Sequence, residues 1–334
     1  MSEHSLPRRQ FNLGLLAPAL LGPVAGGAWA QADWPAGRTI RIVSPSQPGG
    51  VTDVIARLLA ERWARTLKTT VLVDNKPGGT GSLALNEVAK AAPDGTTLVV
   101  GFSGANVIHP LMNAKLPFNA LKDFTAIGLM ANLGNVMVVH PSLPIHNLAE
   151  FIAHAKAQPA GKPVLYGSWG NGSGGHLAGE YLKILTGIDL QHVPHRAMNV
   201  LVQDMMGGHM PVGFLDLNTA RIHVGSGKLR AIAMTGPNRA SVLPEVPTMV
   251  EQGVKFGIGI WLGLFGPANL PPPVLARLNA ELRDALLAPE YAERWQNMFG
   301  GRPTPGTPEE FDRTVRADWD VWKRVIEQGK VTAD

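Results

Sequence analysis

Residues 39–53 read TIRIVSPSQPGGVTD, an apolar run followed by a turn rich in proline and glycine. The run Thr39–Ser44 is short and β-branched, which predicts a buried strand. After the turn, apolar residues recur at helical spacing over 54–63. Thr52 is a suitable N-cap for that helix, and Asp53 would lie in its favourable first turn. The stretch therefore predicts a strand, a loop and a helix in immediate succession.

The same order of elements repeats along the chain. Further strands are predicted over 70–74 and 96–100, with a helix over 82–91 between them. This βαβαβ order implies a parallel sheet with helices on both faces. A second series then begins, with predicted strands at 135–140, 164–168, 190–193, 211–215 and 229–235 and helices at 147–158, 176–186 and 197–206. A late strand, 258–265, precedes helices at 273–288, 290–299 and 308–326.

Two such series predict an α/β fold of two doubly wound lobes. We expect the first lobe to span 31–131 and to be completed by 256–334, and the second to span 132–255. Open α/β sheets bind ligands at the carboxyl ends of their strands. The loops that follow the strands are therefore where functional residues are expected.

Composition excludes several classes of function. The 334 residues include no cysteine, so disulfides, cysteine-ligated zinc, iron–sulfur clusters and a thiol nucleophile are excluded. A lipoprotein anchor is excluded for the same reason. The formal net charge is +4, and the basic residues form no cluster that would indicate nucleic acid as a partner. Hydrophobic residues make up 45% of the chain, which is ample for a sizeable core.

The N-terminal residues 1–30 have the pattern of a cleaved signal peptide. Arg8 and Arg9 precede a weakly apolar stretch, and the segment ends in Ala28-Trp29-Ala30. We expect cleavage before Gln31 and a mature protein in the periplasm. The paired arginines are similar to a twin-arginine signal. Asn12 occupies a position where that pattern prefers leucine, so the export route stays open.

Two glycine-rich loops, 45–53 and 168–176, connect a predicted strand to a predicted helix, one in each lobe. Glycine allows the backbone N–H groups to approach a ligand closely. A helix N-terminus leaves several N–H groups unpaired and carries partial positive charge, which favours an anion. Such loops also occur as ordinary tight turns. Their presence in both lobes favours an anion clamp made of main-chain groups.

An exported NADP-dependent oxidoreductase is the alternative. Residues 170–175 satisfy G-x-G-x-x-G between a strand and a helix, the pattern of a dinucleotide-binding loop. The acidic residue expected at the end of the next strand is missing, because Asp189 precedes that strand. Arg196 follows the strand and could hold a 2′-phosphate. No phosphate-binding P-loop motif is present.

A serine hydrolase is a third hypothesis. Ser103 follows a predicted strand, and Asp216 and His223 come later in the order of a triad, but the final glycine of G-x-S-x-G is missing. Ser103 and Gly104 more readily supply donors at a third strand end. A metal site is not expected, because Pro194 separates His192 from His195 and no H-E-x-x-H occurs.

An ordered set of motifs resembles a known family, the Bug or TctC-type periplasmic receptors of the tripartite tricarboxylate transporters. The resemblance covers essentially the whole mature chain, and the set is more specific than any motif alone. The matching segments are PGGVTD at 48–53, NKPGGTG at 75–81, APDG at 92–95, GNG at 170–172, HLAGE at 176–180, GKLRA at 227–231, LPEVPT at 243–248 and GLFGPA at 263–268.

The resemblance implies a Venus-flytrap fold, in which two lobes joined by crossing segments close on a small organic carboxylate. It also implies a binding protein without catalytic activity, cofactor, metal or nucleic-acid partner. We expect a monomer that passes its ligand to membrane permease subunits or to a sensor. The implied ligand contacts are Ser46, Gln47, Gly49, Gly50 and Thr52 in the first lobe and Ser168, Asn171, Gly172, Ser173, His195 and Asp216 in the second, with Ser103 and Gly104 as weaker candidates. Asp53 is expected to brace its own loop, because its carboxylate would repel an anion.

Several positions differ from the family pattern. Ser46 and Gln47 replace the usual Phe and Pro, which predicts a more polar far end for the ligand. His195 replaces a usual Tyr. Trp169 stands where a small residue is usual, and its ring could either stack on a planar acid or pack under the loop. The identity of the carboxylate therefore stays open.

Overall fold

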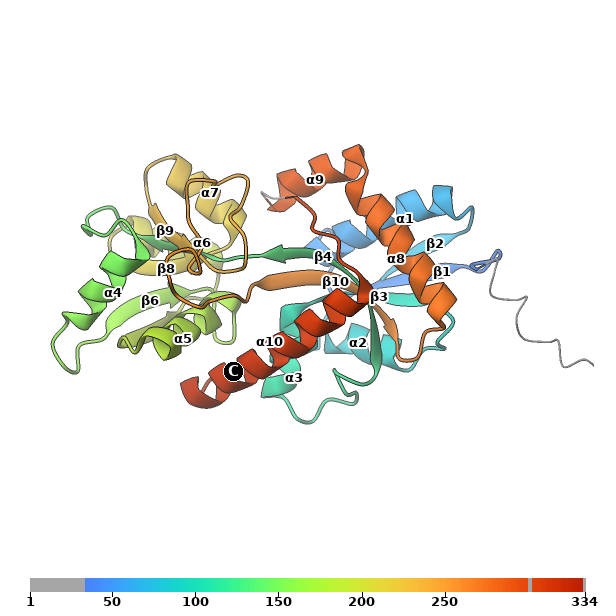
Figure 1. The fold of residues 1–334 in the computed structure, drawn as a ribbon, viewed down its shortest axis with the longest axis horizontal. Coiled ribbons are helices and arrows are strands. Elements are labelled where there is room, and N and C mark those ends of the chain that lie inside the picture. The colour runs from blue at the N-terminus through green and yellow to red at the C-terminus, as the bar shows by residue number, and fades with distance from the viewer. Residues whose placement is uncertain (1–33, 300–301, 333–334) are drawn as a thin grey trace, which may run out of the picture.

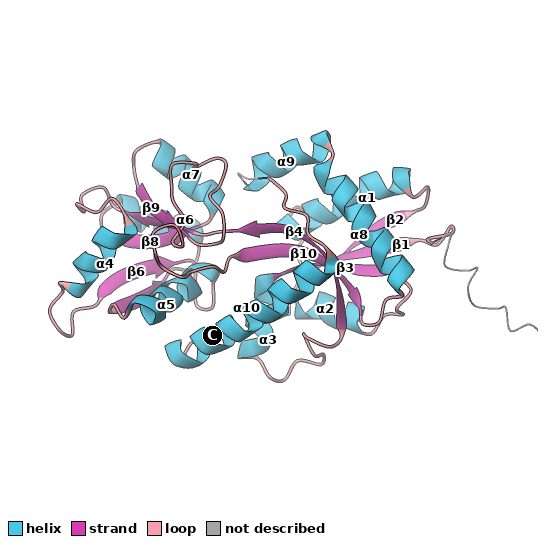
Figure 2. Cartoon of the chain, viewed as in Figure 1, coloured by secondary structure: helices cyan, strands magenta, loops and turns pink. Residues whose placement is uncertain are grey.

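The computed structural model describes residues 34–299 and 302–332 (Figure 1). The predicted signal peptide, residues 1–30, lies outside the described residues. Two five-stranded sheets build two lobes that lie side by side (Figures 1 and 2). Lobe 1 contains the sheet with strand order β2-β1-β3-β10-β4, and lobe 2 contains the sheet with order β7-β6-β8-β5-β9. The predicted α/β fold of two doubly wound lobes is confirmed.

The strands of lobe 1 are β1 (Ile40–Ser44), β2 (Val71–Asn75), β3 (Thr97–Phe102), β4 (Phe124–Leu133) and β10 (Ile260–Pro267). Those of lobe 2 are β5 (Val136–Val139), β6 (Val164–Ser168), β7 (Leu190–Pro194), β8 (Val212–Leu215) and β9 (Arg230–Met234). The helices are α1 (Val51–Thr66), α2 (Ser82–Ala89), α3 (His109–Met112), α4 (Leu148–Lys156), α5 (Gly174–Thr186), α6 (Met198–Met206), α7 (Leu217–Gly225), α8 (Pro272–Leu287), α9 (Pro289–Phe299) and α10 (Pro308–Gly329). None of the helices in the described ranges combines the length and the apolar character that a membrane crossing requires.

Strand β1 is an inner strand of the lobe 1 sheet, and it has buried side chains on both faces. It pairs in parallel with β2 and β3, as the sequence predicted. Ile40 and Ile42 face a core shared with α1 and α8, whereas Val43 faces a second core shared with α2 and α10. Successive side chains of β1 therefore point to opposite faces of the sheet. The 45–50 loop begins at the carboxyl end of β1, which is the end where open α/β sheets bind ligands.

Strand β5 of lobe 2 likewise has buried side chains on both faces of its sheet. Met137 and Val139 contribute to the core that α4 and α5 cover, and Val136 and Val138 contribute to the core that α6 and α7 cover. Strand β5 is antiparallel to both of its neighbours, β8 and β9, while β6 is parallel to β7 and β8. Both faces of this sheet are therefore covered by helices.

Two segments cross between the lobes, and each passes through a glycine that has no room for a side chain. Strand β4 leads into β5 through Gly134, where a Cβ would overlap the carbonyl oxygen of Thr235. The Thr235 hydroxyl accepts a hydrogen bond from the Asn135 N–H (2.7 Å). The Thr235 N–H donates a hydrogen bond to the Asn135 carbonyl (2.9 Å). The second segment enters β10 through Gly259, where a Cβ would overlap the side chain of Asn132. The crossing is therefore built from close backbone contacts.

Helix α10 connects the lobes a third time, because it packs on β4 of lobe 1 and on α5 of lobe 2 (Figure 1). Thr307 and Glu310 form a capping box at its start. The Phe311 ring fills the space above Gly263 of β10. Further along, Asp318 accepts a hydrogen bond from Trp261 Nε1 (2.9 Å). One apolar cluster thus runs through both lobes along this helix.

Apart from the short 3-10 helix Gly79–Gly81, the sequence analysis missed three elements, namely β4, the helical segment that includes α3, and α7. Strand β4 contains Ala, Leu and Met between its β-branched residues, so its local pattern does not separate strand from helix. Helix α7 is only weakly amphipathic, and Leu217 and Ala220 are its buried residues. A short π-helix, Gly104–Ile108, precedes α3. All three elements depend on tertiary packing more than on local propensity.

Substitution of Gly134 tests whether the crossing needs a bare backbone. Gly134→Ala should lower the free energy of unfolding by about 1–3 kcal/mol, because the new methyl group overlaps the Thr235 carbonyl. The control is Gly257→Ala, at a position with no heavy atom within 4 Å of the added Cβ, which should change stability by less than about 0.5 kcal/mol. Equal denaturant midpoints for the two variants would contradict the close contact.

Asp318 should make stability depend on pH. Its burial raises its pKa to about 7, and the hydrogen bond from Trp261 opposes this only in part. Because the native carboxyl holds its proton more tightly than the unfolded one, Asp318 weakens the fold progressively as pH rises from about 4 to about 7. Asp318→Asn should therefore raise the melting temperature at about pH 8, where ionisation costs up to about 4 kcal/mol, and much less at about pH 5. Asp320→Asn, at an exposed position of the same helix, is the control; an equal effect at both pH values would rule out the titration of Asp318.

Candidate ligand-binding site

A cavity of about 640 Å³ lies between the two lobes, and we call it the interlobe cavity. Lobe 1 contributes residues from the β1–α1 loop, β3, both crossing strands and α9, and lobe 2 contributes the start of α7. The lining residues are Pro45, Ser46, Val51, Thr52, Phe102, Leu133, Gly134, Asn135, Asp216, Leu217, Asn218, Thr219, Ile260, Leu262, Met298 and Phe299. Its volume suits a small organic molecule.

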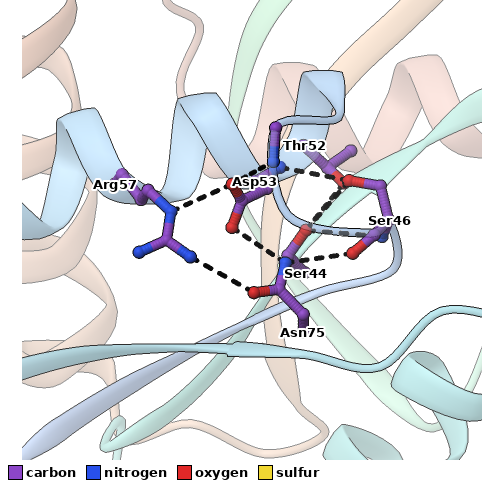
Figure 3. A network of polar contacts seen from close by, with 7 residues as sticks. Ser44, Ser46, Thr52, Asp53, Arg57 and Asn75 are labelled. Atoms are coloured by element: carbon purple, nitrogen blue, oxygen red, sulfur yellow. Dashed lines mark hydrogen bonds and ion pairs between the residues drawn. The ribbon is translucent and has the colours of Figure 1, made fainter.

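The β1–α1 loop is held in shape by the buried carboxylate of Asp53 (Figure 3). Asp53 accepts hydrogen bonds from the Gly49 N–H (2.8 Å), from Asn75 Nδ2 (2.8 Å) and from Arg57 Nε (2.9 Å). Burial alone would raise the pKa of Asp53, but the bonds from Arg57, Gly49 and Asn75 together lower it. Asn75 also donates to the Ser46 carbonyl (3.0 Å). The prediction that Asp53 braces its own loop is confirmed.

Three hydroxyl groups, from Ser44, Ser46 and Thr52, cluster at the start of α1 (Figure 3). Ser46 Oγ lies 2.8 Å from Thr52 Oγ1 and 3.2 Å from Ser44 Oγ. It also accepts the N–H of Asp53 (3.3 Å), so it satisfies one of the donors at the helix N-terminus. Gly50 lies against this cluster, because a Cβ there would approach Ser46 to within 2.6 Å. The loop is therefore closely packed around Ser46.

Internal bonds satisfy several N–H groups of this loop and leave the first two of α1 for a ligand; in the described ranges the Gln47 N–H also has no recorded acceptor, but Gln47 does not line the cavity. The Gly49 N–H is bonded to Asp53, and the Gly50 N–H is bonded to the Gln47 carbonyl (2.9 Å). Within the described ranges no acceptor is recorded for the N–H groups of Val51 and Thr52, the first two residues of α1. Both residues line the interlobe cavity. The N-terminus of α1 thus presents unpaired donors at the cavity.

The second glycine-rich loop is also bonded to itself. The Gly172 N–H donates to His176 Nδ1 (3.0 Å), and the Ser173 N–H donates to the Gly170 carbonyl (3.3 Å). Ser173 caps α5 by accepting the His176 N–H (3.3 Å). In the described part of the chain, the N–H groups of Gly174 and Gly175 have no recorded acceptor. Helix α5 therefore has two donors left at its N-terminus.

The start of α5 packs against residues that line the interlobe cavity. A Cβ on Gly174 would overlap the side chain of Ile260 and lie 3.1 Å from Asn135 Nδ2, and both of these residues line the cavity. Gly172 approaches Met112 of lobe 1, since a Cβ there would lie 3.3 Å from its methyl carbon. The two glycine-rich loops thus reach the same region from opposite lobes.

His192, which is neutral, contacts two residues of the second glycine-rich loop. His192 stacks on His176 with ring centroids 3.8 Å apart, and His192 Nε2 lies 2.7 Å from Ser168 Oγ. Burial, with smaller contributions from His176 and His195, lowers the pKa of His192 to about 3. Ser173 donates its hydroxyl to Ser168 (3.0 Å). These contacts keep Ser168 buried and orient the capping hydroxyl of Ser173.

The structure places the candidate contacts in two groups, those that line the interlobe cavity and those that do not. Ser46, Thr52 and Asp216 line the interlobe cavity. His195 is buried, and its ring bonds to Asp204 Oδ2 (3.0 Å) and to the Val193 carbonyl (3.1 Å), while Trp169 packs on the start of α5 beside Gly175. The candidates that do not line the cavity are Gln47, Gly49, Gly50, Ser103, Gly104, Ser168, Trp169, Asn171, Gly172, Ser173 and His195.

Most of the lining residues were not anticipated. Leu133 and Ile260 lie on the crossing strands, Leu217 to Thr219 form the start of α7, and Met298 and Phe299 end α9. A signal existed for Pro45 and Val51, which lie in the predicted loop 45–53, and for Phe102 and Asn135, which lie near predicted strand ends. The mostly apolar wall argues against the more polar far end that Ser46 and Gln47 led us to expect.

The hydrolase hypothesis lacks the geometry that it requires. Ser103 Oγ and His223 Nδ1 are buried and have no hydrogen-bond partner in the described structure. Asp216 instead caps α7, accepting the Thr219 N–H (2.9 Å) and the Thr219 hydroxyl (2.6 Å). A triad would need these groups bonded in sequence. Over the described residues, moreover, no group of three or more His, Asp or Glu side chains is placed to hold a metal ion.

Comparison with known proteins agrees with this architecture. Residues 55–331 match the model of the family TctC, described as the tripartite tricarboxylate transporter family receptor. A UPF0065 protein from the gbd 5′ region of Cupriavidus necator is 34% identical over 86% of this chain and 88% of its own. Protein BugT of Bordetella pertussis is 29% identical over 87% of this chain and 89% of its own.

Two solved structures with ligands are also similar. Rpa4515 of R. palustris with adipate is 27% identical, covers 90% of this chain and 99% of its own, and has a TM-score of 0.68. MatC of Rhodopseudomonas palustris with bound malate is 29% identical, covers 86% of this chain and 99% of its own, and has a TM-score of 0.63. On the family match and these similarities, the chain belongs to the Bug/TctC family of periplasmic solute-binding receptors, which are not enzymes.

Proposed function

We propose that this protein captures a small organic carboxylate in the interlobe cavity and delivers it to a tripartite tricarboxylate-type transporter or to a sensor. The observation that carries the proposal is the pair of unpaired N–H groups of Val51 and Thr52 at the cavity. A helix N-terminus attracts a carboxylate through these donors and through its dipole. The ligands of the two neighbours, adipate and malate, are carboxylates and support the same class.

A main-chain clamp is required here because the cavity has no basic side chain of its own. Within the described residues, no Lys, Arg or His is among the lining residues. We infer that one carboxylate oxygen is held by the N–H groups of α1 and that Ser46 and Thr52 add hydroxyl donors. The unpaired donors of Gly174 and Gly175 would complete the clamp when lobe 2 moves toward lobe 1. The free energy that favours closure equals the free energy of the additional contacts that the ligand makes in the closed state.

The cellular context follows from the predicted N-terminal segment. We propose that residues 1–30 direct export to the periplasm, by the general or the twin-arginine route, and that the mature protein acts there as a monomer. A binding protein of this kind needs an affinity in the micromolar range, which corresponds to about −8 kcal/mol. The NADP oxidoreductase and hydrolase hypotheses are not retained, since the family is not enzymatic.

The anion clamp is tested by placing a charge at the N-terminus of α1. Val51 is half exposed, lines the cavity and is the first residue of the helix, so an aspartate fits there without strain. Val51→Asp should weaken binding of the acid at least about 100-fold, because the fixed carboxylate repels the ligand at close range. The acid is chosen by thermal shift from a panel of succinate, malate, citrate, adipate, hexanoate and benzoate, and affinities are measured by calorimetry.

The control is Val51→Asn, which has nearly the same shape as the aspartate variant but no charge. It should bind within about tenfold of the wild type, whereas the aspartate variant should melt at or above the wild-type temperature because it complements the helix dipole. Equal affinities for the aspartate and asparagine variants would refute an anion at this helix. Failure of every acid in the panel to shift the melting temperature of the folded wild type would refute the proposed function as a whole.

A further inference from the structure

The wall of the interlobe cavity indicates which carboxylates this receptor accepts. We propose that its ligand carries a single carboxylate on an apolar body of about six to ten carbons, in contrast to the dicarboxylates bound by the two neighbours with known ligands. This inference rests on the proposed function, because it assumes that the N-terminus of α1 binds the carboxylate. It concerns the remainder of the molecule.

Apolar side chains make up most of the wall. They come from both crossing strands, from β3, from the start of α7 and from the end of α9. The apolar lining residues are Pro45, Val51, Phe102, Leu133, Leu217, Ile260, Leu262, Met298 and Phe299. The polar lining residues are Ser46, Thr52, Asn135, Asp216, Asn218 and Thr219. Ser46 and Thr52 lie beside the proposed carboxylate position, and the Thr219 hydroxyl is bonded to Asp216. An apolar body would therefore be buried against matching surface.

The end of α9 contributes two apolar residues, Met298 and Phe299, to the wall of the cavity. Helix α9 belongs to lobe 1 and contacts α7 of lobe 2, so it lies beside the cavity where the lobes meet (Figure 1). The ring of Phe299 packs on the ring of Trp295, with centroids 4.6 Å apart, and this contact helps to fix its position. Met298 beside it is flexible and polarisable and can adapt to ligands of different shape. Neither residue offers a hydrogen bond to a second carboxylate.

A second carboxylate would also meet an unfavourable charge. Asp216 is the one ionisable side chain among the lining residues of the described chain. The helices that reach the cavity, α1, α7 and α9, carry five arginines, but none of them is among the lining residues. Arg62, Arg65 and Arg294 pair with acidic side chains. Arg57 is bonded to Asp53 and Asn75, and Arg221 is bonded to Asn218 Oδ1 (3.2 Å). The far end of a dicarboxylate would therefore have no cationic partner and would face the carboxylate of Asp216.

Hexanoate and adipate form a matched pair for the test, because they have the same six-carbon chain and differ only in the terminal methyl or carboxylate group. Calorimetry on the mature protein should show hexanoate binding at least about tenfold more tightly than adipate. Across butanoate, hexanoate and octanoate, affinity should rise by about fourfold for each methylene that the wall buries. Asp216→Asn keeps an N-cap residue for α7 and should reduce the hexanoate-to-adipate affinity ratio several-fold.

The outcomes separate this inference from the proposed function. Adipate binding as tightly as hexanoate, or an affinity that does not rise with chain length, would overturn the inference and leave the proposed function intact. An unchanged hexanoate-to-adipate ratio in Asp216→Asn would show that Asp216 does not select against the second carboxylate and would also overturn it. Loss of hexanoate binding in Val51→Asp, but not in Val51→Asn, would support both proposals. Absence of binding by every acid in the panel would overturn the proposed function itself.

Discussion

The buried carboxylate of Asp53 is the contact on which the site depends. By accepting the Gly49 N–H and the Asn75 amide, it shapes the β1–α1 loop, and the bond from Arg57 lets it remain charged inside the fold. With those loop donors satisfied, the unpaired N–H groups at the start of α1 are those of Val51 and Thr52, two residues that line the interlobe cavity. A residue that would repel the ligand directly thus prepares the surface that attracts it.

The two lobes are connected in a way that suits a closing cavity. Gly134 and Gly259 bring the crossing segments into close backbone contact, and α10 packs on both lobes. A continuous apolar cluster along α10 joins the two lobes, and the interlobe cavity is lined in part by the crossing strands themselves. Movement of lobe 2 would therefore change the cavity while the shared cluster keeps the lobes together.

The sequence allowed the fold and the loops to be predicted, but not the cavity wall. The PGGVTD segment predicts a loop before a helix because glycine, proline and a capping pattern act locally, and the role of Asp53 follows from its charge. By contrast, Phe299 and Leu133 meet only in the folded chain, since they are distant in sequence and belong to an unremarked helix end and an unpredicted strand. His195 could not be assigned from the sequence either, because its burial and its bond to Asp204 arise only in the folded chain.

The central claim is that main-chain groups at the start of α1 hold the ligand's carboxylate. A crystal structure of the mature protein with hexanoate bound tests this most directly. The account predicts carboxylate oxygens at about 2.7–3.2 Å from the backbone nitrogens of Val51 and Thr52, with the alkyl chain directed toward Phe102 and Phe299. A carboxylate paired with an arginine or lysine side chain, with the start of α1 left to solvent, would contradict it.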